Sequence, residues 1–215
     1  MSRRSGGNKL YLFDSSYRRQ GYKLIAGVDE AGRGPLAGPV VAAAVILEEK
    51  AELPGIDDSK KLSQKQRERA FKLVLENSLA VGVSIVAPEE IDRINILQAS
   101  LKAMNYALCS LNLRPDLVLI DGNKIPRGLT KGLNPTEARA VVAGDSLSLA
   151  IAAASIIAKC LRDSLMRGYH NDFPGYGFDK HKGYGTRQHI AALNKYGPCA
   201  IHRRSFEPVK SLLGA

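Results

Sequence analysis

The sequence predicts an α/β protein in which a mixed β-sheet is flanked by helices and followed by a helical C-terminal addition. Short apolar, β-branched stretches gather early in the chain, and segments with helical periodicity alternate with them. The last third is helical and then irregular in pattern. With 215 residues, against a prior of ~150 per domain, we expect one domain with an appendage, able to bury a full core.

Five stretches are predicted as strands. Residues 22–28 and 40–47 are apolar and β-branched and flank a Gly/Pro-rich turn, which indicates two paired central strands. Residues 80–86 follow as a third strand. Residues 116–120 are nearly all apolar, as expected of a strand buried on both faces, and residues 138–142 form a weaker fifth strand.

Helices are predicted between these strands and after them. Ser63 and Gln66 form a capping-box pattern at the start of a helix over 63–77. Residues 96–111 carry apolar side chains at intervals of three and four, so one face of that helix is expected to cover the sheet. Further helices are expected at residues 9–20, 148–167 and 186–195, with a short one that begins at Pro88.

The chain is expected to have three parts. Residues 1–21 form a basic N-terminal appendage, residues 22–170 the sheet-containing catalytic domain, and residues 171–215 a helical extension packed on that domain. The three cysteines form no Cys-x-x-Cys pair, and no apolar run is long enough for a signal peptide or a membrane helix. We therefore expect a soluble, cytoplasmic monomer without a disulfide framework.

The net charge is strongly positive. Thirty-one Lys and Arg residues against 21 Asp and Glu residues give +10 at pH 7, and such a field attracts polyanions, nucleic acids first. The same excess can serve only to keep a protein soluble, and net charge alone does not decide between the two interpretations.

Carboxylates stand at the ends of three predicted strands. Asp29 and Glu30 end the first strand, Asp121 ends the buried strand, and Asp145 follows the weaker one. Ligands commonly bind where strands end, although an isolated Asp-Glu pair is more often only solvated. Neighbouring side chains of a strand point to opposite faces, so Asp29 and Glu30 are expected to share a site only if the strand ends or bulges between them.

Four carboxylates gathered in one place repel one another unless cations neutralise them. Because no His or Cys accompanies them, Mg²⁺ or Mn²⁺ suits this set better than zinc. Two such ions about 4 Å apart support in-line displacement at phosphorus. Together with the positive charge, the pattern points to a metal-dependent phosphodiester nuclease.

The glycines that follow the acids do not form a nucleotide-cofactor motif. Gly32, Gly34 and Gly38 have the spacing G-x-G-x-x-x-G, and a strand follows where a dinucleotide-binding motif needs a helix. The sequence contains no P-loop. A nucleotide-cofactor enzyme is therefore disfavoured.

Eight motifs follow one another along the chain: GVDEAGRGPLAGPVV at 27–41, DSKKLS at 58–63, IDRINI at 91–96, DG at 121–122, GDS at 144–146, AASIIAK with RD at 162–163, YGFDKHKGYGT at 176–186 and HRRSF at 202–206. In this order they resemble ribonuclease HII, the type 2 ribonuclease H family, over about residues 24–208. The resemblance implies a ribonuclease H-like fold, with a five-stranded mixed sheet, flanking helices and a helical C-terminal extension.

The resemblance implies an endoribonuclease that cleaves RNA in RNA/DNA hybrids and at ribonucleotides embedded in duplex DNA. The cut lies 5′ of the ribonucleotide at the RNA–DNA junction and leaves 3′-hydroxyl and 5′-phosphate ends. The catalytic and metal-binding residues that it implies, with Mg²⁺ or Mn²⁺, are Asp29, Glu30, Asp121 and Asp145. The position of Asp145 depends on the GDS motif alone, because residues 130–135 resemble an insertion. Asp163 is a nearby alternative, otherwise expected to pair with Arg162 or Arg167.

The resemblance also implies substrate contacts. Gly32 and Gly34 would let the backbone approach a ribose 2′-hydroxyl, and Arg33 would hold the adjacent phosphate. Tyr184, between two glycines, would pack on the sugar at the DNA side of the junction. Candidate phosphate contacts, which as isolated basic residues are more often only solvated, are Lys60, Lys61, His181 and Lys182, and the same caution applies to Arg203 and Arg204.

Two other functions stay open on the sequence. A nuclease of the same fold class, such as a junction resolvase or a type 1 ribonuclease H, would differ in substrate, since the type 1 enzyme needs a longer RNA run. A basic, non-catalytic nucleic-acid-binding module would use the carboxylates only for metal-supported stability. Such a module would melt at a magnesium-dependent temperature without nicking nucleic acid.

Overall fold

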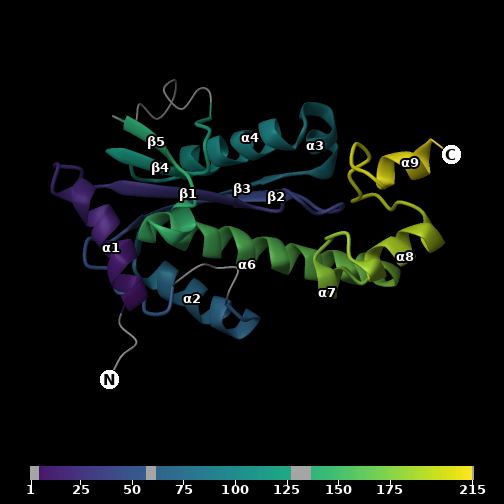
Figure 1. The fold of residues 1–215 in the computed structure, drawn as a ribbon, viewed down its shortest axis with the longest axis horizontal. Helices are drawn as coiled ribbons and strands as arrows, with labels where there is room; N and C mark the ends of the chain where they lie inside the picture. Colours follow the sequence, from purple (N-terminus) through teal and green to yellow (C-terminus); the bar gives the residue numbers. More distant parts are fainter. Residues whose placement is uncertain (1–4, 57–61, 127–136, 215) are drawn as a thin grey trace.

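A five-stranded mixed sheet forms the centre of the molecule (Figure 1). The computed structural model describes residues 5–56, 62–126 and 137–214; Lys60, Lys61 and the apparent insertion at 130–135 lie outside the described residues. The strands are β1 (Ile25–Ala31), β2 (Val40–Leu47), β3 (Ser78–Val86), β4 (Leu117–Asp121) and β5 (Glu137–Val141). They lie in the order β3-β2-β1-β4-β5, with β1–β2 and β2–β3 antiparallel and β1–β4 and β4–β5 parallel. The predicted sheet is confirmed.

Helices cover both faces of this sheet. They are α1 (Ser5–Arg18), α2 (Gln64–Glu76), α3 (Pro88–Ile94), α4 (Ile96–Cys109), α6 (Leu149–Asp172), α7 (Phe178–His181), α8 (Arg187–Tyr196) and α9 (Val209–Leu213), with 3-10 turns η1 (Gly144–Ser146) and η2 (Pro174–Tyr176). Helix α4 packs on β2 and β3, while α6 crosses β1 and β2 on the other face and carries α2 on its outer side (Figure 1). The predicted capping box is confirmed, because Ser63 and Gln66 each accept the other's backbone N–H.

Helix α6 approaches the sheet most closely at Gly27. A Cβ at this position would lie 2.0 Å from the carbonyl carbon of Ala150, so only glycine fits where the helix crosses β1. Small buried side chains such as Ala43 in β2 and Ala153 in α6 keep the two layers close. This contact fixes the end of β1, where Asp29 lies, relative to α6.

The N-terminal helix α1 is docked on the body of the protein. Leu10 is buried among residues of β2, α2 and α6, and buried Asp14 accepts the backbone N–H of Ala150 at 2.9 Å. Burial raises the pKa of Asp14 to about 6. The helix begins at Ser5 rather than at residue 9. The N-terminal region is therefore packed on the body of the protein, in addition to being basic as the sequence shows.

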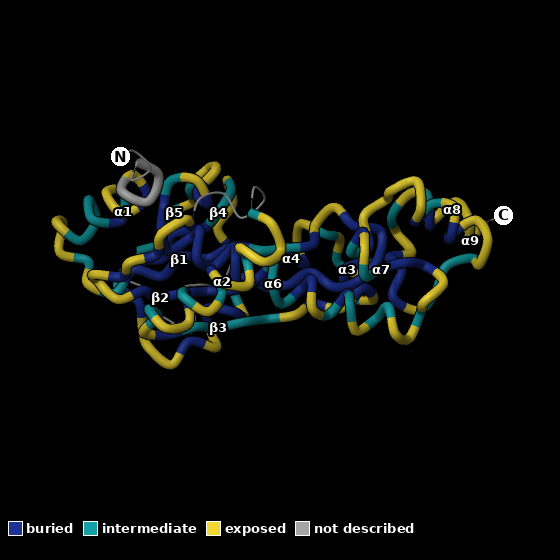
Figure 2. Tube along the Cα trace, turned by 90° about the horizontal axis from the view of Figure 1, so that it is seen from below, coloured by how far each residue is buried: buried dark blue, intermediate teal, exposed yellow. Residues whose placement is uncertain are grey.

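The segment after α6 forms one end of the molecule (Figures 1 and 2). Helix α6 itself continues past residue 170 to Asp172. Three buried imidazoles lie in this end: the rings of His181 and His189 stack at 4.5 Å, and Nε2 of His189 lies 3.0 Å from Nε2 of His202. Burial lowers the pKa of His189 and of His202 to about 4, so both rings are neutral at pH 7.

Within the described ranges, every helix is too short or too polar to span a lipid bilayer. Cys109, Cys160 and Cys199 are free thiols.

Candidate active site

Two parallel strands bring Asp29, Glu30 and Asp121 to one edge of the sheet. In the register of β1 with β4, Val28 pairs with Ile120. The three acids follow directly after this pair, at the carboxyl ends of both strands. The sequence-based expectation that the strand ends gather carboxylates therefore holds for these three residues.

Strand β1 neither ends nor bulges between Asp29 and Glu30, contrary to the expectation for a shared site. Asp29 pairs with Ala43 and Glu30 with Ala42 in unbroken register, so the two side chains leave opposite faces of the strand. Asp29 accepts a hydrogen bond from Ser155 of α6. Both acids nevertheless interact by charge with Asp121, because that carboxylate lies beside them on the neighbouring strand.

Burial and mutual repulsion raise the pKa of both acids in β1. Burial first, and then the charges of Glu30 and Asp121, raise the pKa of Asp29 well above its usual value. The pKa of Glu30 is also raised, because burial outweighs the guanidinium of Arg33, whose Nη1 lies 3.3 Å from Oε1. A cation bound among these groups would favour their ionised forms.

Asp121 and Asp145 lie around one turn. The backbone N–H of Gly144 donates to Oδ1 of Asp121 at 2.7 Å, and Asp145 follows Gly144 in the turn η1. Asp145 is buried. The chain thus places Asp145 next to Gly144, the residue that Asp121 contacts.

The acidic cluster suits a hard divalent cation in its chemistry. Asp29, Glu30 and Asp121 offer only oxygen donors, which Mg²⁺ and Mn²⁺ prefer. Oε2 of Glu30 is buried without a hydrogen-bond partner among the described residues, and a cation there would compensate for its burial. In that same part of the chain, no three His, Cys, Asp or Glu side chains already surround one point at ligating distance. Binding an ion would therefore require these side chains to turn toward each other, away from local partners such as Arg33 and Gly144.

The β1–β2 loop (residues 32–39) carries the Gly-Arg-Gly element beside Tyr184. The side chain of Arg33 is 53% exposed. A Cβ at Gly34 would lie 3.7 Å from Cε1 of Tyr184, so the exposed tyrosine ring stands against this glycine. Gly32 has a φ of +103°, and a Cβ there would lie 2.1 Å from Nε of Arg162. Gly32 is therefore required by the packing of the protein itself, whereas Gly34 leaves space next to Tyr184.

His181 and Lys182 are bonded within their own segment. Nε2 of buried His181 lies 2.8 Å from the carbonyl oxygen of Tyr176, and Nδ1 accepts the N–H of Gly183. Nζ of Lys182 donates to the carbonyl of Asp179, and burial lowers the pKa of this lysine. His181 has no ring nitrogen left for a phosphate, against the sequence-based prediction.

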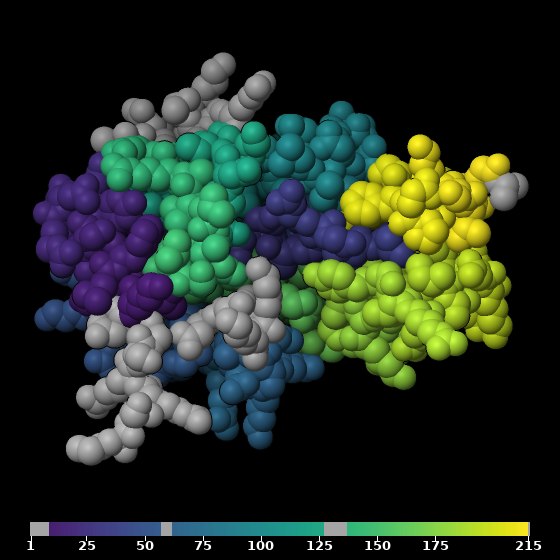
Figure 3. Space-filling view, in the orientation of Figure 1, coloured from purple at the N-terminus to yellow at the C-terminus, as the bar shows by residue number. Residues whose placement is uncertain are grey.

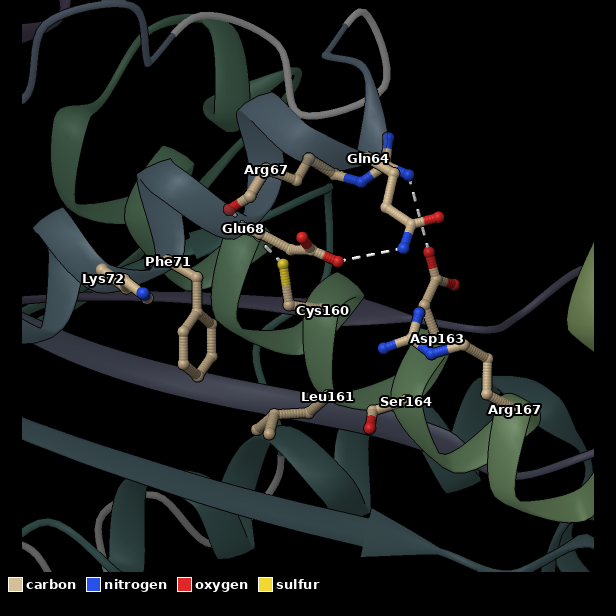
Figure 4. A pocket seen from close by; sticks show the side chains of 10 residues that line it. All are labelled: Gln64, Arg67, Glu68, Phe71, Lys72, Cys160, Leu161, Asp163, Ser164 and Arg167. Carbon is tan, nitrogen blue, oxygen red and sulfur yellow. Dashed lines mark hydrogen bonds and ion pairs between the residues drawn. The ribbon is translucent and has the colours of Figure 1, made fainter.

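Asp163 belongs to a separate cluster between α2 and α6 (Figure 4). It forms ion pairs with Lys159 at 2.7 Å and with Arg67 at 3.6 Å, rather than with Arg162 or Arg167 as expected. Figure 4 shows Asp163 at a cavity of about 280 Å³ that both helices line. These ion pairs give Asp163 a structural role outside the acidic cluster.

Two buried arginines have contacts that the sequence did not predict, and Arg203 is enclosed by the protein rather than exposed for the phosphate contact considered above. Arg162 and Arg203 are fully buried, and both donate hydrogen bonds to backbone carbonyls of the β1–β2 loop. In Figure 3 this loop, in indigo, lies between the teal layer of α3 and α4 and the yellow C-terminal segment. The HRRSF motif contains Arg203 and Arg204, but two adjacent arginines give no sign of which one is buried.

Comparisons with known proteins identify the family. The sequence profile of ribonuclease HII matches residues 26–209. Ribonuclease HII of Geotalea uraniireducens is 56% identical over 202 residues, which cover 94% of this chain and 90% of the relative. Ribonuclease HII of Chlamydia muridarum is 53% identical over 200 residues, with coverage of 93% and 89%.

The fold is shared with a solved structure. The crystal structure of ribonuclease H2 from Pyrococcus horikoshii superposes with a TM-score of 0.71 at 30% sequence identity, covering 88% of this chain and 96% of that one. The ribonuclease H-like fold that the motifs imply is thereby confirmed. The chain belongs to the ribonuclease HII family and is an endoribonuclease that acts on the RNA of RNA/DNA hybrids.

Proposed function

We propose that this ribonuclease HII cleaves on the 5′ side of the ribonucleotide at an RNA–DNA junction, both in hybrids and where one ribonucleotide is embedded in duplex DNA. The products carry 3′-hydroxyl and 5′-phosphate ends. One observation carries the proposal: an acidic cluster lies within a few residues of a loop whose Gly34 stands against Tyr184. The acidic cluster suits hydrolysis of a phosphodiester, and the surface formed by Gly34 and Tyr184 suits contact with a sugar.

The proposed metal ligands are Asp29, Glu30, Asp121 and Asp145. Mg²⁺ or Mn²⁺ bound by these carboxylates would supply activation of the attacking water and stabilisation of charge on the departing 3′ oxygen. Three properties support this assignment: the oxygen-only donors, the unpartnered Oε2 of Glu30 and the repulsion that raises the pKa of Asp29.

Arg33 and Tyr184, which both lie next to Gly34, orient the substrate. The exposed guanidinium of Arg33 can exchange Glu30 for the neighbouring phosphate, because an arginine binds both kinds of oxyanion. The ring of Tyr184 offers a surface for a deoxyribose, which has no 2′-hydroxyl to clash. Nζ of Lys159 and Cζ of Arg162 lie 5.8 and 6.0 Å from the ring centroid and help to hold it. Lys60, Lys61 and Lys182 stay candidate phosphate contacts.

A DNA duplex with one embedded ribonucleotide tests the specificity. The protein is incubated with this duplex with and without Mg²⁺, and the cut is mapped at nucleotide resolution. We expect one nick, 5′ of the ribonucleotide, that requires the divalent ion. A cut at another position, or a need for several consecutive ribonucleotides, would contradict the proposed specificity and favour that of a type 1 enzyme.

Asp121→Asn tests the acidic cluster. We expect cleavage to fall by roughly a thousandfold, because a lost ligand removes several kcal/mol of charge stabilisation. The Asn side-chain oxygen can still accept the N–H of Gly144, so melting temperature and duplex binding should change little. Asp172→Asn, at an exposed position of α6, is the matched control and should cleave normally. Unchanged turnover in Asp121→Asn would end the proposal.

A further inference from the structure

Two buried arginines hold the backbone of the β1–β2 loop. Arg162 of α6 donates from Nε to the carbonyl of Pro39 at 2.9 Å and from Nη2 to that of Ala37 at 3.1 Å. Arg203 donates from Nε to the carbonyl of Gly38 at 3.0 Å. The second half of the loop is thus bonded from two sides by charged donors.

Arg203 alone also reaches the Gly-Arg-Gly element. Its Nη1 donates to the carbonyl of Arg33 at 2.9 Å and its Nη2 to the carbonyl of Gly32 at 2.5 Å. The third bond of Arg162 goes elsewhere, to the carbonyl of Lys182 at 3.0 Å. Both arginines therefore hold residues 37–39, and Arg203 also holds the Gly-Arg-Gly element.

The charges of these arginines depend on the loop carbonyls. Within the described residues, neither guanidinium forms an ion pair with a carboxylate. Burial lowers the pKa of Arg203 to about 9 and that of Arg162 to about 10, so both stay charged at pH 7. A charge buried without a counter-ion is unfavourable unless hydrogen bonds solvate it. The carbonyls supply that solvation, and in return they are fixed in place.

The bonds of Arg203 determine where two N–H groups point. The carbonyl of Gly32 and the N–H of Arg33 belong to one planar peptide group, and the carbonyl of Arg33 and the N–H of Gly34 belong to the next. Fixing each carbonyl therefore fixes the opposite N–H, and a cation on the carbonyl strengthens that N–H as a donor. In the part of the chain that the structure describes, no backbone carbonyl accepts either N–H. Arg33 and Gly34 are both exposed, so a ligand can approach their N–H groups.

We propose that Arg203 is a positioning residue for ribose recognition, because its guanidinium holds the N–H groups of Arg33 and Gly34 in the direction in which they meet the ribonucleotide. This inference rests on the proposed function, which assigns the Gly-Arg-Gly element to the ribose. Arg203 is fully buried behind the loop and touches no substrate. It governs the preference for a ribonucleotide, whereas affinity for duplex DNA depends on phosphate contacts.

Binding with cleavage blocked separates these two effects. In Asp121→Asn, affinity is measured for two duplexes of identical sequence, one of DNA only and one with a single ribonucleotide. Asp121→Asn is expected to prefer the second. Adding Arg203→Lys keeps the charge but removes the planar fork of donors. We expect Arg203→Lys to reduce the ratio of the two affinities, ribonucleotide duplex over DNA-only duplex, by about tenfold. Affinity for the DNA-only duplex should change by less than about twofold.

Arg162→Lys in the same background is the matched control. Arg162 is equally buried and also makes three bonds to carbonyls. It packs beside Gly32 and the ring of Tyr184, but none of its three bonds goes to the peptide groups that flank Arg33. Arg162→Lys should lower the melting temperature about as much as Arg203→Lys does, but it should retain more of the preference for the ribonucleotide duplex. The inference is overturned if Arg203→Lys lowers the preference no more than Arg162→Lys does. If Asp121→Asn alone shows no preference, the proposed function fails instead.

A second measurement needs no change at Arg203. In Asp121→Asn, the NMR signals of the Arg203 guanidinium are expected to shift more on addition of the ribonucleotide duplex than of the DNA-only duplex. The reason is that the guanidinium bonds the carbonyls of the same two peptide groups whose N–H groups are proposed to meet the ribonucleotide. Equal shifts would overturn the inference, even where Arg203→Lys does not fold.

Discussion

At the residue scale, the acidic cluster works against the stability of the fold. Asp29 is buried, and its pKa is raised well above the usual value by burial and by the charges of Glu30 and Asp121. A carboxyl whose pKa is higher in the folded than in the unfolded state stabilises the protein at low pH. That contribution is lost as the pH rises through the folded-state pKa. At neutral pH, without a cation, the ionised cluster therefore destabilises the protein.

Asp29→Asn is expected to raise the melting temperature at pH 7 in EDTA while it abolishes cleavage. The amide oxygen keeps the hydrogen bonds from the Glu30 N–H and from Ser155, but the repulsion is gone. Relief of one pKa unit is worth about 1.4 kcal/mol, or roughly 3–5 °C for a chain of this size. Calorimetry of Asp29→Asn beside Asp172→Asn gives the comparison, and a lower melting temperature in Asp29→Asn alone would contradict the expected repulsion.

Sequence reasoning found the acids because their position is a pattern along the chain. Asp29, Glu30 and Asp121 each follow an apolar strand, and parallel pairing brings such positions together. It named Arg203 only as a candidate phosphate contact and did not predict its bonds to the β1–β2 loop, because that loop lies far away in the sequence. It also attributed Gly32 to ligand approach, whereas the side chain that fills the space next to Gly32 belongs to α6.

At the element scale, α1 contributes to the hydrophobic core as well as to the charge. Deletion of residues 1–21 removes buried Leu10 and the bond from Ala150 to Asp14. Loss of a buried leucine costs about 2–5 kcal/mol, so we expect the melting temperature to fall by roughly 5–15 °C. The matched variant Lys9→Gln/Arg19→Gln, at two exposed positions of this region, should melt normally. Equal melting of the deletion and the full chain would show that the docking is worth little.

The same pair of exposed positions gives the cleaner test of a basic appendage. Figure 1 places α1 at the opposite end of the sheet from the C-terminal segment that borders the β1–β2 loop. If Lys9 and Arg19 contact the duplex, neutralising them flattens the dependence of affinity on salt by up to about two counter-ions. An unchanged slope in the folded double variant would exclude these contacts.

The elements that could be predicted are those with strong local signals. Helix α2 has its capping box, α4 has its apolar periodicity, and β4 has an unbroken apolar run. The short helices α7 and α9 were missed, because four or five residues are too few to show a helical period. The position of α7 depends on packing against α6 and on aromatic contacts such as that between Tyr176 and Phe178. Helix α9 is held through Val209, which is buried with Leu36 and Leu193.

At the scale of the whole molecule, a relay of neutral imidazoles connects the parts of the C-terminal end. The N–H of Cys199 donates to Nδ1 of His202 at 2.9 Å, and Nε2 of His202 lies 3.0 Å from Nε2 of His189. Nδ1 of His189 lies 3.0 Å from the carbonyl of Tyr184. The relay is complete when His202 donates to His189 and His189 donates to Tyr184, so both rings must be neutral.

This relay predicts a loss of stability in mild acid. The pKa of both histidines is lowered from 6.5 to about 4 in the folded state, first by burial. Between these values the unfolded chain binds more protons, so the free energy of unfolding falls as the pH falls. We expect the two rings to lower it by about 5 kcal/mol between pH 7 and pH 4.5. The raised pKa values of Asp14, Asp29 and Glu30 act in the opposite direction over the same range, and urea unfolding measures the net change. NMR titration provides the check, because rings of His189 and His202 that protonate near pH 6.5 would contradict the prediction.

The bonds of the β1–β2 loop join distant parts of the chain: 165 positions separate Arg203 from Gly38, and 123 separate Arg162 from Pro39. Closing such long intervals is entropically unfavourable until the rest of the sheet is assembled. Substrate recognition should therefore mature late in refolding. After dilution from denaturant, circular dichroism should recover first, and nuclease activity should follow with a measurable lag.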